Sequence, residues 1–363
     1  MYKNTKWQIP TDFMERSHFE RALLRLDWRS SPGYPYLKVG VSNGDFFKID
    51  DPEKYEAQKD FVWNIIQQRI NGGEPDLIRL FVKPEPLNSK KIASCTYRLI
   101  SSVSVVDQII DHMLFGECND EYINNCYNIP NKAGWTYLKG GYRIMPKRKW
   151  IAIDKSKWDW SVKEWLLEMD LEVRMNLCTN MNLLWQRLAV MRYNQLFKNP
   201  KFVTSNGLVL KQKQPGVMKS GCVNTISSNS NMQVILHVLA CNEMGIPITN
   251  IMSMGDDTLQ EPIHGNMEDY LAILRRYSHV KHAVQQNEFA GMVFGSTIEP
   301  LYRAKHAYNL LHVNPEFLQE ITTSYTILYH RSKYAEWMRW FFTEMGTTVP
   351  TREVCDLILE GDD

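Results

Sequence analysis

A Gly-Asp-Asp triplet between two short apolar runs limits the fold of this chain more than any other feature does. The runs cover residues 248–254 and 258–263, and Gly255, Asp256 and Asp257 separate them. A glycine followed by aspartate between two such runs indicates a tight β-hairpin, because glycine supplies the backbone freedom that the turn requires. The sequence therefore predicts a hairpin that carries acidic side chains at its tip.

The segments around the hairpin predict a mixed α+β core. Residues 150–154 alternate as a half-buried strand does, and they end on Asp154. Ser161 and Glu164 have the spacing of a capping box, which opens a predicted helix that runs to residue 177. Helical spacing of apolar residues, ended by Gly or Pro, predicts helices near 53–70, 224–244 and 270–277 and mostly helix over 315–345. Residues 289–294 are predicted to form a strand or hairpin. The order strand, helix, helix, hairpin, helix favours an α+β fold.

Composition excludes several classes of protein. The 363 residues are 44% hydrophobic, which is enough for one large core or two to three small ones. A net charge of +1 gives no overall signal for nucleic-acid binding, so any RNA site must come from local charge separation. Seven cysteines without a Cys-x-x-Cys pair argue against a disulfide framework or a zinc knuckle and favour a reducing compartment. No apolar run approaches the roughly 18 residues of a membrane span, so membrane contact must be peripheral or mediated by partners.

Asp154 and Asp256 are candidate metal ligands. Phosphoryl transfer from a nucleoside triphosphate uses two divalent ions about 3.5 to 4 Å apart, and hard cations bind carboxylate oxygens. A hairpin tip beside a strand end would bring the two carboxylates together on rigid elements. An ordinary turn and an ordinary strand end are the alternative interpretations. Asp159 can join the two acids only if the chain turns sharply after Asp154.

The predicted helix 224–244 carries polar residues on a face where a core helix would be apolar. Thr225 and Asn229 are four residues apart and share that face, and Ser220 and Gly221 precede it. Capping and solvation of a surface helix are the alternative explanation. Beside two metal-binding acids, the same groups suit a nucleotide site.

Taken in order, these segments resemble the motifs of positive-strand viral RNA-dependent RNA polymerases. The closest resemblance is to sobemovirus-like and polerovirus-like replicases, over about residues 20–310. The matching segments are Ser31-Pro32-Gly33-Tyr34-Pro35, Phe81-Val82-Lys83-Pro84-Glu85-Pro86 with Arg98-Leu99-Ile100, Asp154 to Ser161, Ser220 to Asn229, Ser253 to Asp257, Lys281, and Phe289 to Phe294. Each motif alone is weak, but their order and intervals together are highly specific.

The resemblance implies an α+β right-hand polymerase fold, in which an antiparallel palm sheet is flanked by helices. It assigns residues 1–148 to the fingers, with the N-terminal extension and fingertips, 149–178 to the palm, 179–214 to a fingers insertion, 215–294 to the palm, and 295–363 to the thumb.

The resemblance also implies roles for individual residues. Asp154 and Asp256, supported by Asp257, would bind two Mg²⁺ ions, for which Mn²⁺ can substitute. Lys281 would be the general acid that protonates pyrophosphate, and a solvated surface lysine is the alternative. The other implied sites are ribose selection by Asp159, Ser220, Thr225 and Asn229, a triphosphate channel of Lys83, Lys90, Lys91 and Arg98, a template entrance at Ser31, Gly33 and Pro35, and a primer grip at Phe289 and Phe294.

The implied activity is template-directed RNA synthesis from nucleoside triphosphates, for viral genome replication and transcription. The implied partners are the RNA template and product and the nucleoside triphosphates. A protein primer and other viral replication proteins are further candidate partners. The expected location is the host-cell cytoplasm, in membrane-associated replication complexes reached through such partners.

The chain departs from the family pattern in three places. Thr96 stands where the first of two arginines is usual, so Arg98 is alone. Lys157 stands where glycine is common, so the backbone there lacks glycine's freedom. The part of the chain after residue 295 is short for a thumb.

Three other functions compete with RNA synthesis from ribonucleotides. A reverse transcriptase normally rejects the 2′-hydroxyl with a bulky side chain where Asp159 stands, whereas Asp159, Thr225 and Asn229 offer hydrogen-bonding groups. An inactive relic that binds RNA or serves as a scaffold would not need its acids, yet all of them are present. A non-enzymatic helical interaction protein would require every motif to be accidental. Incorporation of labelled nucleotides on an RNA template separates these possibilities.

Overall fold

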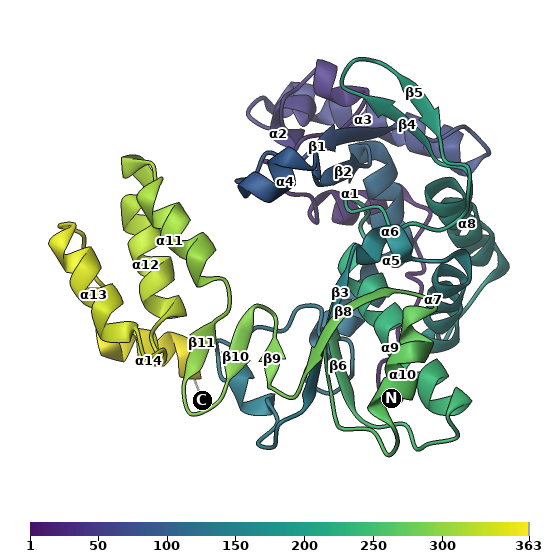
Figure 1. Ribbon diagram of the computed structural model, residues 1–363. Coiled ribbons are helices and arrows are strands. Elements are labelled where there is room, and N and C mark those ends of the chain that lie inside the picture. The colour runs from purple at the N-terminus through teal and green to yellow at the C-terminus, as the bar shows by residue number, and fades with distance from the viewer. Residues whose placement is uncertain (362–363) are drawn as a thin grey trace.

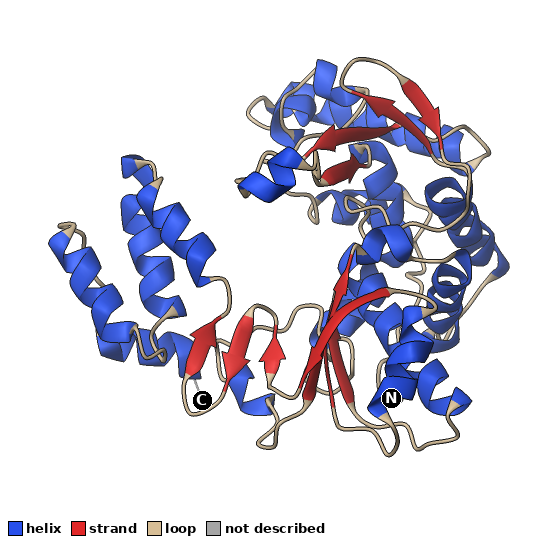
Figure 2. Ribbon diagram, in the orientation of Figure 1, coloured by secondary structure: helices blue, strands red, loops and turns tan. Residues whose placement is uncertain are grey.

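Three β-sheets organise the protein, whose computed structural model describes residues 1–361 (Figure 1, Figure 2). The first sheet has the order β2 (Leu99–Ser102), β1 (Ile78–Val82), β4 (Lys201–Thr204), β5 (Val209–Lys211); the second has β6 (Ile251–Met254), β7 (Asp257–Gln260), β3 (Ile151–Ser156), β8 (His279–Val284); the third has β11 (Ile298–Pro300), β10 (Met292–Phe294), β9 (Glu288–Phe289). The ribbon has an open, C-shaped outline, with the second and third sheets at its base (Figure 1).

Helices make up the rest of the regular structure (Figure 2). They are α1 (Arg16–Leu23), α2 (Asn43–Phe47), α3 (Pro52–Ile70), α4 (Ser89–Ala93), α5 (Val105–Asn124), α6 (Trp158–Ser161), α7 (Glu164–Leu177), α8 (Leu183–Tyr193), α9 (Thr225–Glu243), α10 (Met267–Arg275), α11 (Arg303–Leu311), α12 (Leu318–Leu328), α13 (Ala335–Glu344) and α14 (Arg352–Glu360), with short turns of other helix types at Tyr36–Lys38, Gly141–Ile144, Asn194–Lys198 and Pro315–Phe317. No helix in the described part of the chain is long and apolar enough to cross a membrane.

The sheet of β3, β6, β7 and β8 is fully antiparallel and contains the predicted acidic hairpin. Met254 pairs with Asp257, so Gly255 and Asp256 alone form the turn. Gly255 has φ +66°, the positive value that a type II′ turn requires at its first central residue. The backbone N–H of Gly255 donates to the hydroxyl of Ser230 on α9 at 2.9 Å. The hairpin is confirmed, and a neighbouring helix supports its tip.

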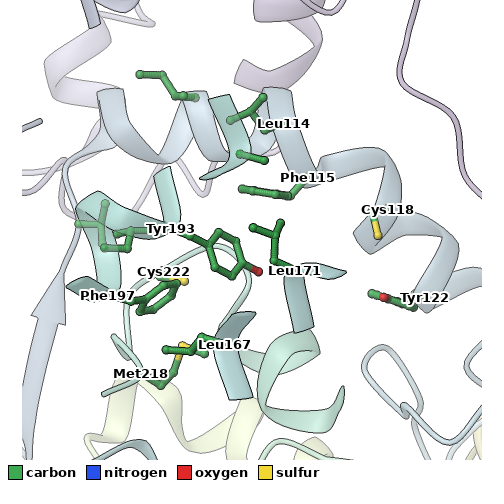
Figure 3. Close-up of a cluster of buried hydrophobic side chains, with 14 of the residues drawn as sticks. Leu114, Phe115, Cys118, Tyr122, Leu167, Leu171, Tyr193, Phe197, Met218 and Cys222 are labelled. Carbon is green, nitrogen blue, oxygen red and sulfur yellow. The ribbon is translucent and has the colours of Figure 1, made fainter. Parts of the chain in front are cut away.

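The main hydrophobic core lies where α5, α7 and α8 meet the segment that leads into α9 (Figure 3). Phe115 on α5 packs against Tyr193 on α8, and Tyr193 packs against Phe197, in each case edge to face. Leu167 and Leu171 reach this cluster from α7. This cluster holds α7 in place, and α7 packs on α9, which in turn packs on β6 of the acidic sheet.

The first sheet joins parts of the chain that lie far apart in sequence. Its strand β1 pairs in parallel with β4, and Ile78 faces Phe202 in that register. Strands β1 and β2 fall within residues 1–148, whereas β4 and β5 fall within 179–214. Long-range pairing therefore makes one structural unit from both segments.

The C-terminal helices form an arm that is attached to the base by α14 (Figure 1). The backbone N–H groups of Lys139 and Gly140 donate to carbonyls near the end of α14 at 3.0 and 2.7 Å. The carboxylate of Glu360 accepts hydrogen bonds from Tyr142 and Arg143. These contacts tie the end of the arm to the loop that precedes β3.

The predicted capping box at Ser161 and Glu164 is wrong. Helix α7 begins at Glu164 after Lys163, and no side chain caps it. The hydroxyl of Ser161 instead donates to the carbonyl of Trp158, because Ser161 ends the separate short helix α6. The sequence spacing does not reveal that an additional turn intervenes.

Lys157 produces this additional turn. Its φ is +54°, in the left-handed region that favours glycine. It is also the position where the resembling family commonly has glycine. A non-glycine residue in this conformation costs roughly 1–2 kcal/mol.

We predict that Lys157→Gly leaves the protein at least as stable as wild type, because the relief of backbone strain offsets the added chain entropy of about 0.5–1 kcal/mol. Lys157→Val should be destabilising by more than 1 kcal/mol, because β-branched side chains are the least tolerant of positive φ. Thermal unfolding of the two variants checks this. A lower melting temperature for the glycine variant than for the valine variant would contradict it.

Candidate active site

Asp154, Asp256 and Asp257 lie together at one end of the sheet that contains β3. Strand β7 pairs with β3, and Ile153 faces Thr258, which places Asp154 beside the tip of the hairpin. Burial is the main cause that raises the pKa of Asp256, and the neighbouring Asp154 adds to it. Burial followed by repulsion from Asp256 and Asp154 raises the pKa of Asp257 to about 6. The three carboxylates are thus close enough to repel one another, as expected of a site for cations.

Lys281 is directed at this group by an irregularity in β8. Asp154 pairs with His282 and Lys155 pairs with Val280, so Lys281 is left without a partner on β3. Such a bulge turns a side chain away from its regular direction. The Nζ of Lys281 lies 2.9 Å from Oδ2 of Asp154, and this hydrogen bond raises the pKa of the lysine. The structure brings Lys281 to the acids, as the sequence analysis predicts.

Asp159 and Asn229 form a second polar pair beside the acids. The Nδ2 of Asn229 donates to Oδ1 of Asp159 at 2.9 Å, and the indole of Trp158 donates to Oδ1 of Asn229 at 2.9 Å. The left-handed turn at Lys157 returns the chain so that Asp159 reaches α9. Burial raises the pKa of Asp159, and the charge of Asp256 adds to this effect. The proposed ribose site therefore contains an ordered hydrogen-bonded pair.

Ser220 and Thr225 make different contacts. The hydroxyl of Ser220 accepts from the backbone N–H of Ser101 at 3.1 Å, and Gly221 packs so closely that a Cβ would lie 2.4 Å from the carbonyl oxygen of Ser101. The hydroxyl of Thr225 donates to carbonyls in the turn before α9 at 2.8 and 2.7 Å. These two hydroxyls fix the entry of α9 against β2, and a direct contact with ribose stays a prediction.

The basic residues predicted for the triphosphate channel lie on or near the first sheet. Lys83 and Arg98 both face Glu85, with nitrogen to oxygen distances of 3.6 and 3.4 Å. The charge of Arg98 lowers the pKa of Asp159 and Asp256, so Arg98 faces the acidic end of the second sheet. Lys90 and Lys91 are exposed on α4, which lies on the side of its sheet toward the C-terminal arm (Figure 1). The structure thus places one of these four cations within electrostatic range of the acids.

The predicted template entrance packs against the start of α5. Gly33 has φ +70°, and a Cβ there would lie 2.9 Å from the Cα of Ser104. Ser31 is exposed and Pro35 is partly buried beside it. Only glycine fits this close approach, which explains the motif in structural terms.

Phe289 and Phe294 lie inside the protein, 1% and 8% exposed. Both rings pack on Trp135, with centroid distances of 5.5 and 6.2 Å. The predicted β-hairpin at 289–294 is confirmed, but its two phenylalanines stabilise it from within. Contact between these rings and a primer is therefore not supported, and a grip by the hairpin turn stays a prediction.

Sequence reasoning missed two residues that shape this site. Trp158 orients Asn229, and its place directly before Asp159 in the first acidic motif was a usable signal. Lys155 is buried beside the acids, and burial lowers its pKa to about 8 although Asp256, Asp154 and Asp257 all raise it. The predicted strand ends at Asp154, so no sequence signal identified Lys155.

A cavity of about 180 Å³ opens beside the acids. Its lining includes Asp154, Asp257 and Lys281 together with Glu288 and Tyr302. It therefore connects the acidic sheet with the β9–β10 hairpin and with the start of the C-terminal arm. Within residues 1–361, no three His, Cys, Asp or Glu side chains are grouped closely enough to hold a metal ion by themselves.

This chain belongs to the viral RNA-dependent RNA polymerase family, whose profile matches residues 14–262. It is 32% identical over 287 residues to the replicase polyprotein P2AB of Cocksfoot mottle virus (72% of this chain, 28% of that protein) and 33% identical over 279 residues to protein P1-P2 of Potato leafroll virus (70% and 25%). It is 29% identical to the RNA-directed RNA polymerase of Mushroom bacilliform virus (74% and 69%). The predicted likeness to sobemovirus and polerovirus replicases is confirmed.

The comparison with solved structures confirms the predicted fold class. The Sicinivirus 3Dpol RNA-dependent RNA polymerase matches with a TM-score of 0.72 at 17% sequence identity, covering 92% of this chain and 78% of that one. The chain therefore has the α+β right-hand polymerase fold. It spans about a quarter of the length of the Cocksfoot mottle virus and Potato leafroll virus proteins.

We predict that Asp257→Asn stabilises the metal-free protein at neutral pH. The pKa of Asp257 is about 6 in the folded protein and 3.8 in the reference state, so folding favours its protonated form. As the pH rises from about 4 through 6, the free energy of unfolding of wild type should therefore fall relative to that of the variant. The difference should reach roughly 1–2 kcal/mol at pH 7.5. Melting temperatures measured in EDTA across this range check the prediction. If the melting temperatures of wild type and variant differ by the same amount at pH 4 and at pH 7.5, the prediction is contradicted.

Proposed function

We propose that this protein is an RNA-dependent RNA polymerase, which adds ribonucleoside monophosphates to the 3′-end of an RNA strand on an RNA template. The observation that carries the proposal is the convergence of Asp154 and Asp256 at one end of a sheet, beside Lys281 and the Asp159–Asn229 pair. Membership of the family supports it. The activity would serve viral genome replication and transcription.

The acids suit Mg²⁺, with Mn²⁺ as a substitute. Mg²⁺ is usually held by one or two carboxylates together with waters and substrate phosphates, so Asp154 and Asp256 are enough to bind it once a nucleotide is present. Asp154 and Asp256 would be the principal ligands and Asp257 a supporting one. Two bound ions would activate the 3′-hydroxyl and stabilise the charge on the departing pyrophosphate. The mutual repulsion of the three acids supports this assignment, because a cation would relieve it.

Lys281 is our candidate for the general acid that protonates pyrophosphate. Its hydrogen bond with Asp154 raises the pKa of the ammonium, so the group carries a proton at neutral pH. The exposed position of its side chain, 63% accessible, lets it turn from Asp154 toward an incoming phosphate. Arg98 can bind the triphosphate with its planar fork, and Lys83, Lys90 and Lys91 can attract it as point charges.

We further propose that residues 1–148 and 179–214 form the fingers, 149–178 and 215–294 the palm, and 295–363 the thumb. The shared sheet of β1, β2, β4 and β5 supports the grouping of the first two segments. Ser31, Gly33 and Pro35 would guide the template, and RNA, nucleoside triphosphates and other viral replication proteins would be the partners. We place this activity in the host-cell cytoplasm, in replication complexes that reach membranes through partners.

Asp256→Ala should abolish nucleotide addition while the protein stays folded, because the change removes a charge that holds the cations. Asp154→Ala should have the same effect. Extension of a primed RNA, measured together with thermal melting, checks both variants. Asp50→Ala is a matched control, since Asp50 is an exposed acid remote in sequence from these motifs and should retain full activity. Near-normal extension by either folded site variant would disprove the metal assignment.

Asp159→Asn should reduce the preference for ribonucleotides over deoxyribonucleotides by about tenfold, the effect of one lost hydrogen bond of about 1.4 kcal/mol. The amide can still accept from Asn229, so the pair with α9 survives. The substitution replaces the second carboxylate oxygen of Asp159 with an amide NH2 group, so that a hydrogen-bond donor would face the ribose in place of an acceptor. Incorporation efficiencies of UTP and 2′-deoxy-UTP give the ratio, and an unaltered ratio would show that sugar selection resides elsewhere. Overall activity should fall less than in Asp256→Ala.

A further inference from the structure

Lys155 is a buried ammonium on the opposite side of β3 from Asp154. Successive side chains of a strand alternate between faces, so Lys155 shares the face of Ile153. Ile153 belongs to the main core, beneath the sheet, whereas Asp154 opens toward the cavity. Lys155 is only 4% exposed. Its charge therefore lies under the acidic end of the sheet and out of contact with solvent.

The described residues around Lys155 offer its ammonium group fewer hydrogen-bond acceptors than it has donors. An ammonium has three donors, and the contact at Nζ is with the hydroxyl of Thr258 at 3.4 Å. That hydroxyl already donates to the carbonyl of Ile153 at 3.0 Å, so it accepts from the lysine. A buried charge with so few partners is expensive unless opposite charges compensate it. The compensation must therefore come from nearby carboxylates.

The carboxylates near Lys155 are those of the candidate metal site. Lys155 directly follows Asp154 in β3, and Thr258, whose hydroxyl its Nζ contacts, directly follows Asp257 in β7. From the helical side, His237 on α9 faces Lys155, and its ring is hydrogen-bonded to Tyr270 and to the carbonyl of Thr249. The acids therefore have one cation above them, Lys281, and one below, Lys155. Lys281 is exposed, whereas Lys155 is buried in the core.

We propose that Lys155 is a positioning residue that partly neutralises the three acids from beneath the sheet. The charge of Lys155 keeps the metal-free site intact. The same charge weakens the attraction of the three acids for divalent cations. The cations are therefore held firmly only when nucleotide phosphates complete their coordination. This inference rests on the proposed function, because it takes the acids to be the metal ligands. It concerns how tightly they bind, which the proposed function leaves open.

Binding of Mn²⁺ alone, followed by electron paramagnetic resonance, tests the proposal without relying on activity. Lys155→Met removes the charge and keeps the shape of the side chain. It should tighten Mn²⁺ binding by about tenfold or more, because this is the order expected for one unit charge acting on a divalent ion across a protein interior. Lys155→Arg keeps the charge and should bind Mn²⁺ within about threefold of wild type. Saturating Mn²⁺ should also raise the melting temperature of Lys155→Met by more than it raises that of wild type.

Lys132→Met is the matched control. Lys132 is equally buried, and its Nζ donates to the carbonyls of Cys126 and Tyr127. Within residues 1–361 it forms no ion pair with a carboxylate. A purely structural role for Lys155 predicts that both methionine variants lose stability and that neither changes Mn²⁺ affinity, and that result would overturn the proposal. If Lys155→Met does not fold, Lys155→Gln, which can still bond to Thr258, takes its place with the same expected shift.

The outcomes separate this inference from the proposed function. One possible result is that wild type binds Mn²⁺ tightly, that Asp256→Ala abolishes this binding, and that Lys155→Met leaves the affinity unchanged. This result overturns the role of Lys155 alone. Equal Mn²⁺ binding by wild type and Asp256→Ala, or no binding by wild type at millimolar Mn²⁺, overturns the metal assignment and this inference together.

Discussion

The pairing of β3 with β7 is the constraint on which the site depends. It places Asp154 beside the tip of the acidic hairpin, although about a hundred residues separate them in the chain. The register is as important as the pairing, because a slip of one residue would turn Asp154 into the core and Lys155 into the cavity. Both neighbours of β3 hold this register, β7 on one side and β8 on the other. The central strand therefore sorts opposite charges onto opposite faces of the sheet.

Placing three carboxylates together works against folding, so the surrounding structure must compensate. Helix α9 does this through polar rather than apolar contacts. Its Ser228 and Asn231 bond to the buried carboxylate of Asp170, which is also paired with Arg174. Such a network holds a helix in one orientation, because each buried polar group is costly to leave without its partner. The same helix carries Asn229 and supports the hairpin through Ser230. A helix held in one orientation therefore also holds Asp159 and the hairpin tip in place.

The family assignment and the physical description of the site are both consistent with the proposed function. The acidic end of the sheet that contains β3, Arg98 on the neighbouring sheet and the Asp159–Asn229 pair lie within one region. The matching relatives from Cocksfoot mottle virus and Potato leafroll virus are about four times as long as the matched region.

The sequence alone determined the local elements and the order of the motifs. The Gly-Asp-Asp hairpin, the helix from Thr225 and the β9–β10 hairpin could be predicted because turns, periodicity and stops are encoded in neighbouring residues. Tertiary structure decided the rest. The bulge that aims Lys281 at Asp154 and the burial of Phe289 arise from contacts between segments that are distant in the chain. The left-handed turn at Lys157 runs against the local preference of a lysine, and packing against α9 outweighs that preference. Local propensity is worth tenths of a kcal/mol for each residue, whereas packing and buried charge are worth several, so the site's geometry follows the long-range contacts.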